Sequence, residues 1–237
     1  MRSWPQGTRG RWRIPALLVC LLSLAAAQPD PVADAAAALE RGDFASAEQK
    51  LKAVLAAHPN HAVALGLLGV ALDGRRKFAE ADQAYRRALA IEPGSPRLLN
   101  NFGNHLLASG NKAGAREVFT KLVALDPAHA NANLQLARLE LERKSGAEAL
   151  RFLDRLPAAM RAAPQVGLLR MRALYECGRR TEADELLERL TSTAPEDVRL
   201  NFSAGMELAA AGQYEKAETF FSRALKVEPA SFDVLYN

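Results

Sequence analysis

A register of 34 residues runs through this chain from Gln28 to Ser231 without an insertion, and every repeat has alanine at its twentieth position. The six repeats and their alanines are 28–61 with Ala47, 62–95 with Ala81, 96–129 with Ala115, 130–163 with Ala149, 164–197 with Ala183 and 198–231 with Ala217. A period of this length is the signature of short structural units that stack on one another. One unit cannot bury its apolar face alone, so the sequence predicts a continuous core shared by all six.

The turn residues and three further positions of the aligned repeats predict the structure of each unit as two helices joined by a turn. Two runs with helical apolar spacing are split by a polar turn, which contains Gly42, Gly110, Gly178 or Gly212 in four repeats. The eighth position is small in most repeats, which lets two helices approach closely, and the twenty-fourth is large and apolar. Proline at the thirty-second position of five repeats ends the second helix.

The repeat resembles the tetratricopeptide repeat family, and the resemblance covers 204 of the 237 residues. It is strongest over 62–129 and 198–231, as in Leu65, Leu68, Gly69, Leu72, Phe78, Ala81, Tyr85, Ala88 and Pro93. The resemblance implies an all-α fold, a right-handed superhelical solenoid of about six antiparallel helix-turn-helix repeats. It also implies a chain that binds another protein or peptide and is not an enzyme.

The chain departs from the pattern in three places. The first repeat replaces its early columns with alanines, which suits a terminal cap. In the fourth repeat Pro157 falls inside the second helix, so we expect that helix to end near Leu156 and 157–164 to form a looser connection and a bend. Residues 232–237 read as the start of a seventh repeat. A solenoid usually closes with a polar helix, so we expect a longer protein or a stack that continues onto a partner, including self-association through this end.

Residues 1–27 have the layout of a secretory signal peptide: four arginines, a short apolar run over 14–24, and the small residues Ala25, Ala26 and Ala27. We therefore expect export to the periplasm or the cell exterior of a bacterium, with an uncleaved membrane anchor as the alternative.

Removing the four arginines of the signal peptide from the 31 basic residues leaves 27, which equals the 27 acidic residues. The mature domain, 28–237, is then neutral, which argues against nucleic acid as a partner, and no part of it is apolar enough to span a membrane.

No catalytic, cofactor or metal pattern stands out. His58, His61 and His129 fall in turns between repeats, and His105 has no second ligand at helical spacing. Cys177 has no histidine beside it that would activate the thiol. We therefore expect no catalytic residue, no cofactor and no metal ion.

The resemblance implies that the second, fifth, ninth and twelfth positions of the first helices line a concave surface. The candidate peptide-binding residues at these positions are Arg97, Asn100, Asn104, Asn131, Leu134, Arg138, Gln165, Leu168, Arg172, Tyr175, Arg199, Phe202 and Met206. Amides can pair with a peptide backbone, arginines with carboxylates, and the apolar side chains can act as anchors. The two-carboxylate clamp of some family members is not carried over, because Gln165 and Leu169 stand where it needs basic residues.

The sequence thus indicates a protein-binding or peptide-binding scaffold that assembles an envelope or secreted complex. The alternative is that it forms the recruiting region of a larger enzyme, such as a glycosyltransferase or a protease, whose catalytic domain lies outside this chain. The length of the open reading frame separates the two interpretations.

The signal-peptide interpretation predicts cleavage after Ala27, because small residues precede the bond that signal peptidase cuts. N-terminal sequencing of the exported protein should begin at Gln28. A sequence that begins at Met1 would instead identify residues 1–27 as an anchor.

Overall fold

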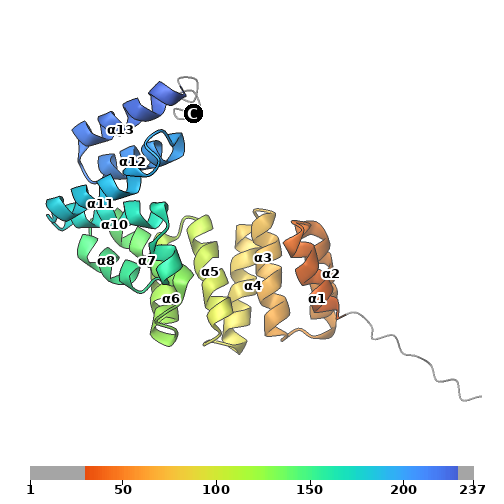
Figure 1. Cartoon of the computed structure of the whole chain (residues 1–237). Coiled ribbons are helices and arrows are strands. Elements are labelled where there is room, and N and C mark those ends of the chain that lie inside the picture. Colours follow the sequence, from red (N-terminus) through yellow and green to blue (C-terminus); the bar gives the residue numbers. More distant parts are fainter. Residues whose placement is uncertain (1–29, 229–237) are drawn as a thin grey trace, which may run out of the picture.

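The computed structural model describes residues 30–228, which contain thirteen α-helices and no strand (Figure 1). Twelve of these helices form six antiparallel pairs, and α9 is an additional short helix. The pairs are α1 (Pro31–Glu40) with α2 (Phe44–Ala57), α3 (Ala62–Gly74) with α4 (Phe78–Ile91), α5 (Pro96–Ala108) with α6 (Lys112–Leu125), α7 (Ala130–Glu142) with α8 (Gly146–Asp154), α10 (Pro164–Glu176) with α11 (Arg180–Ser192), and α12 (Val198–Ala210) with α13 (Tyr214–Val227). The expected all-helical solenoid of about six helix pairs is confirmed. The predicted signal peptide and the start of a seventh repeat lie outside the described residues.

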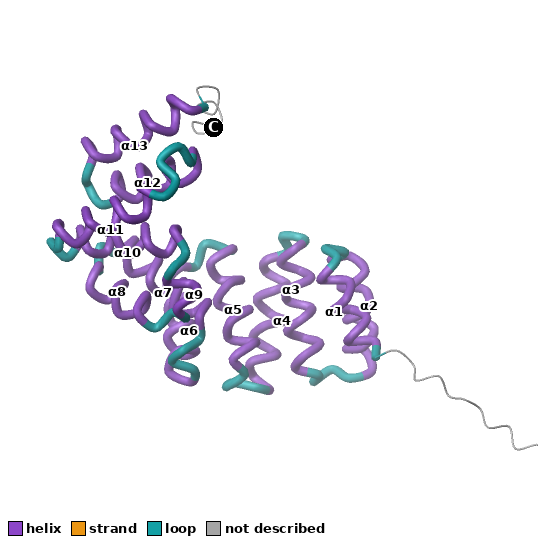
Figure 2. Tube along the Cα trace, in the orientation of Figure 1, coloured by secondary structure: helices purple, strands orange, loops and turns teal. Residues whose placement is uncertain are grey.

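The turn inside each pair needs a backbone conformation that glycine adopts most readily. Gly42, Gly110, Gly178 and Gly212 have φ between 74° and 85° there. The equivalent residues of the other two pairs, Arg76 and Lys144, have φ of 59° and 61°. All six positions are 34 residues apart, so the fold imposes the left-handed conformation even where a side chain disfavours it. Figure 2 shows these short turns between the helices.

Each pair is held together by a close approach between its two helices. A Cβ atom added to Gly69, Gly103 or Gly205 would lie 2.5–2.6 Å from a ring atom of the aromatic residue sixteen positions later. These aromatic residues are Tyr85, Phe119 and Phe221. The small eighth position and the large twenty-fourth position therefore pack directly against each other, as the sequence columns predict.

Polar side chains at the twenty-first repeat position connect one pair to the next. The carboxylate of Glu48 on α2 is nearly buried and receives hydrogen bonds from Lys52, Arg75 and Lys77. The hydrogen bond from Lys52, with those from the other two cations, outweighs burial and lowers the pKa of Glu48 to about 2. In the third repeat the signs are exchanged, because Arg116 donates to the buried Glu140 of α7.

The fourth repeat interrupts the regular stack. Helix α8 ends at Asp154, near the expected Leu156, and the connection to α10 contains α9 (Ala158–Arg161). The buried apolar residues fall into two main clusters that meet at α7, one reaching Leu139 and the other starting at Ala137. In Figure 1 the helix pairs before α7 stack side by side, and the later pairs turn away from them.

Asn201 is buried on α12 and donates to the carbonyl oxygens of Pro195 and Asp197, which holds the start of this helix. Within residues 30–228, none of the helices has the length and apolar character that crossing a bilayer requires.

Replacing Gly103 by valine should destabilise the fold, because the new side chain would collide with the fully buried ring of Phe119. Overpacking of this kind lowers the free energy of unfolding by about 1–3 kcal/mol. The matched control is Gly94→Val, since no atom lies within 4 Å of a Cβ at Gly94. Thermal unfolding followed by circular dichroism should show a lower Tm for Gly103→Val alone; equal Tm values would contradict the packing described.

Candidate functional site: the concave wall

The first helices of the last four pairs, α5, α7, α10 and α12, carry all thirteen candidate residues, and we call this surface the concave wall. In Figure 1 these helices lie toward the inside of the bend, and α8 and α11 lie toward its outside. Through α10 the second helix of each pair packs on the first helix of the next pair, and α12 packs mainly on α10, so successive first helices follow one another along the wall. Candidate side chains that are far apart in sequence therefore lie on neighbouring helices.

Amide side chains on α5 and α7 form a connected network. Asn131 donates to the side-chain oxygens of Asn100 at 2.7 Å and Asn104 at 3.2 Å. Gln135 donates to the oxygen of Asn131 at 3.3 Å. The oxygens of these three asparagines therefore accept hydrogen bonds within the network. The amide nitrogen of the exposed Asn104 makes no hydrogen bond within residues 30–228, so it can donate to a ligand.

Three arginines of the concave wall are exposed and have no hydrogen bond or ion pair in the described part of the chain. They are Arg97 on α5, Arg138 on α7 and Arg199 on α12. A guanidinium in this state keeps all five of its N–H donors available for a carboxylate.

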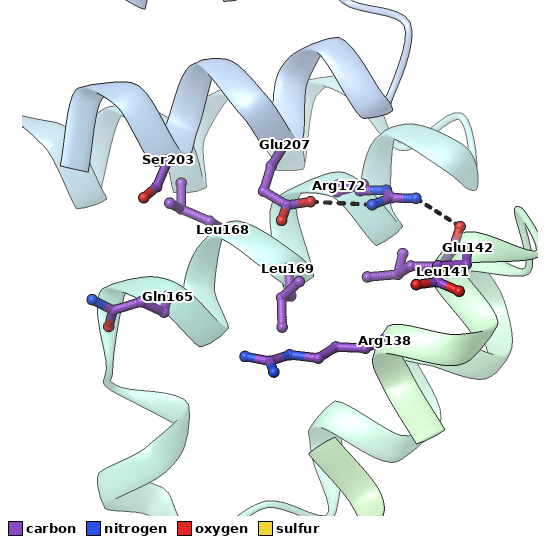
Figure 3. A pocket seen from close by; sticks show the side chains of 9 residues that line it. All are labelled: Arg138, Leu141, Glu142, Gln165, Leu168, Leu169, Arg172, Ser203 and Glu207. Atoms are coloured by element: carbon purple, nitrogen blue, oxygen red, sulfur yellow. Dashed lines mark hydrogen bonds and ion pairs between the residues drawn. The ribbon is translucent and has the colours of Figure 1, made fainter. Parts of the chain in front are cut away.

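Arg172 differs from the expectation that it would be available to a partner. Its side chain is only 13% exposed, and it donates to Glu176 at 3.1 Å, Glu207 at 3.3 Å and the carbonyl oxygen of Leu141 at 2.7 Å. Figure 3 shows its guanidinium between Glu207 and Leu141. Arg172 therefore connects α7, α10 and α12, and its role in the described structure is to fix the shape of the concave wall.

Two apolar candidates are also more buried than a binding anchor would be. Leu168 is 2% exposed and Tyr175 is 6% exposed. The Tyr175 hydroxyl donates to Asp184, and Lys216 donates to both residues. Burial raises the pKa of Tyr175, and the hydrogen bond to Asp184 adds to this rise. Tyr175 thus links two repeats, and it does not present an apolar surface to solvent.

The remaining apolar candidates are more accessible. Met206 is 51% exposed, whereas Leu134 and Phe202 are half-buried. The Phe202 ring packs against Phe221, with 5.6 Å between the ring centroids. Met206 is therefore the candidate that presents an apolar side chain most fully.

Two cavities open on the concave wall, and they share Gln165, Leu168 and Ser203. The first cavity measures about 330 Å³ and lies between α7, α10 and α12, with Arg138 on one side (Figure 3). The second cavity measures about 500 Å³ and lies between α10, α11 and α12, with Arg199 among its lining residues. Both volumes are in the range of sites that accept small ligands or peptide side chains.

Sequence reasoning missed several residues that line these cavities, among them Leu169, Leu190, Leu200, Ser203 and Glu207. Leu169, Ser203 and Glu207 occupy the sixth and tenth repeat positions, beside the positions that the resemblance indicates. Leu190 is on a second helix, so no first-helix pattern could have included it.

Three of the four histidines make structural contacts in the described residues. His61 and His129 cap α3 and α7 by accepting hydrogen bonds from backbone N–H groups three residues later. His105 is buried and its Nδ1 lies 2.6 Å from Asp73, which also accepts from Tyr85. No group of three or more possible metal ligands occurs within residues 30–228.

Comparisons with known proteins agree with this architecture. Sequence profiles described as "Tetratricopeptide repeat" match residues 38–100 and 106–171, and a related profile of the same description matches residues 168–233. No curated protein sequence matches the chain.

Solved structures with the same fold are 17–20% identical in sequence to this chain. A tetratricopeptide repeat protein from Parabacteroides merdae is 20% identical, with a TM-score of 0.70 over 83% of this chain and 78% of its own. PilW, described as a widely conserved type IV pilus biogenesis factor, is 20% identical, with a TM-score of 0.65 over 85% and 93%. YrrB, described as having an unusual peptide-binding site, is 17% identical, with a TM-score of 0.60 over 78% and 96%.

The contacts of Arg172 predict that reversing its charge disrupts the fold. In Arg172→Glu the new carboxylate would face those of Glu176 and Glu207, and the Leu141 carbonyl oxygen would lose its donor. The free energy of unfolding should therefore fall by about 2–4 kcal/mol. Arg138→Glu on the exposed side of the wall should change it by less than about 0.5 kcal/mol. Urea denaturation of both variants tests this difference; equal midpoints would mean that the Arg172 contacts do not hold the wall.

Proposed function

The chain belongs to the tetratricopeptide repeat family, and on that basis we propose that it is a scaffold that holds another protein through a linear segment bound along the concave wall. The observation that carries the proposal is the pair of adjoining cavities on this wall, whose lining includes Arg138 and Arg199, two arginines with no hydrogen bond or ion pair in the described residues. Such a surface has free donors and apolar lining, which are the two features by which grooves bind extended peptides.

Binding, as opposed to catalysis, is the function that the concave wall supports best. Its ionisable side chains are either paired with one another, as in Arg172 with Glu207, or isolated, as in Arg138. Neither arrangement places a nucleophile beside a base, which covalent catalysis needs. We therefore assign the chain to the adaptor proteins, with another protein or a peptide as its partner.

We place this scaffold in the bacterial envelope or outside the cell, where it would help to assemble a larger complex. The signal-like layout of residues 1–27 supports this location. The fold is also that of PilW, a pilus biogenesis factor. An anchor formed by an uncleaved signal would keep the same domain at the membrane surface.

The test is site-specific photo-cross-linking in the cells that produce the protein. A benzophenone amino acid at Gln165, which is exposed and lines both cavities, should give a cross-linked product with a second protein. The same amino acid at Lys121, which is exposed on the second helix α6, is the matched control and should give none.

The pattern of products decides between the two faces of the solenoid. A product from Gln165 alone supports recognition by the concave wall. A product from Lys121 alone would place the recognition surface on the second helices and overturn the proposal.

A further inference from the structure

Each of the two cavities contains one arginine that has no hydrogen bond or ion pair in the described part of the chain. Arg138 and Arg199 line different cavities, and neither has a partner within residues 30–228. The other charged groups there are occupied, since Arg172 binds Glu207 and Glu142 accepts from Lys112 at 2.8 Å. Asp197 in the second cavity has no cationic partner in the described residues; it caps α12 by accepting from the Leu200 N–H, at the positive end of the helix dipole, which stabilises its carboxylate.

Leucine side chains lie between these two arginines. Leu168 and Leu169 line the first cavity, and Leu168 with Leu190 and Leu200 lines the second. The second cavity exists because α12 packs mainly against α10 and only slightly against α11, unlike the equivalent helices of the other pairs. Leu190 of α11 lines the resulting cavity.

We propose that the segment bound by this wall is an extended acidic peptide in which an apolar side chain enters the second cavity and flanking carboxylates reach Arg138 and Arg199. The inference rests on the proposed function and specifies its ligand. Charge complementarity carries it, since Arg138 and Arg199 have no hydrogen bond or ion pair within residues 30–228, whereas Asp197 already serves as the N-cap of α12. The apolar lining distinguishes a peptide from a nucleic acid, whose backbone offers phosphates but no leucine-like side chain.

The spacing of the two carboxylates follows from the spacing of the helices. Arg138 is on α7 and Arg199 on α12, with α10 between them. Two helix spacings amount to roughly 16–20 Å. Arg138 stands at the ninth repeat position and Arg199 at the second, which adds an offset of about 10 Å along the helix axes. An extended chain covers the combined distance of roughly 19–23 Å in about six or seven residues at about 3.3 Å each.

The experiment uses fluorescence anisotropy with the purified full chain and a labelled, C-terminally amidated peptide, Asp-Gly-Ser-Leu-Ser-Gly-Asp between Gly-Ser flanks. We expect saturable binding that weakens by about tenfold when both aspartates are changed to asparagine. Replacing the central leucine by serine should weaken it by a similar factor. Arg138→Glu and Arg199→Glu should each weaken binding by about tenfold, whereas Lys121→Glu and Arg189→Glu, exposed and unpaired on α6 and α11, should not.

A cavity-filling variant tests the leucine contact independently of charge. Thr193 is exposed and lines the second cavity, so Thr193→Trp should weaken the leucine peptide and leave the serine peptide unchanged. Circular dichroism confirms that each variant is folded.

Other outcomes overturn the inference in distinguishable ways. Equal binding of the asparagine peptide would show that the aspartates do not bind the two arginines. Displacement of the peptide by an oligothymidylate of twelve nucleotides would indicate a nucleic-acid site. Absence of peptide binding together with a cross-link from Gln165 would reject the acidic peptide and leave the scaffold function intact. Absence of both would reject the two proposals together.

Discussion

The contact between the eighth and twenty-fourth positions of a repeat is the interaction on which the rest of this structure depends. The rings of Tyr85 and Phe119 lie against the backbone of the preceding helix, where only Gly69 and Gly103 leave room for them. This contact fixes the distance between the two helices of a pair. It also determines which faces of the two helices stay uncovered within the pair. One of these faces packs on the next pair, and another forms the concave wall.

Stacking then depends on polar contacts that differ from one junction to the next. Glu48 pairs with cations of the following turn, Arg116 with Glu140, and Asp184 with Lys216. Each junction has its own set of partners, although the apolar columns repeat. Because a solenoid contacts only its neighbours, such differences can alter the stack locally without disturbing the remaining repeats.

The change at the fourth repeat shows how a local difference shapes the site. Pro157 cannot continue a helix, so α8 is short and the two core clusters meet at α7. After this point the chain turns. Lys144 reaches across the whole fifth repeat to the carbonyl oxygen of Ala210, and Arg172 joins Leu141 of the preceding repeat to Glu207 of the following one. Both cavities of the concave wall lie in this turned half.

The sequence by itself determined the six helix pairs and their close packing, because these depend on a period of 34 residues and on side-chain size at fixed positions. The helices expected to line the concave wall followed from the resemblance to the tetratricopeptide repeat family. It also indicated the interruption at Pro157. Only the tertiary structure decided which wall residues are available. Arg138 and Arg172 share the ninth position of neighbouring repeats, yet one is free and the other is held by three groups. The physical reason is that availability depends on contacts between residues up to 35 positions apart, and their geometry is set by the angle between successive pairs. That angle, and the opening between α11 and α12, arises from the packing of all the helices together and leaves no periodic trace in the sequence.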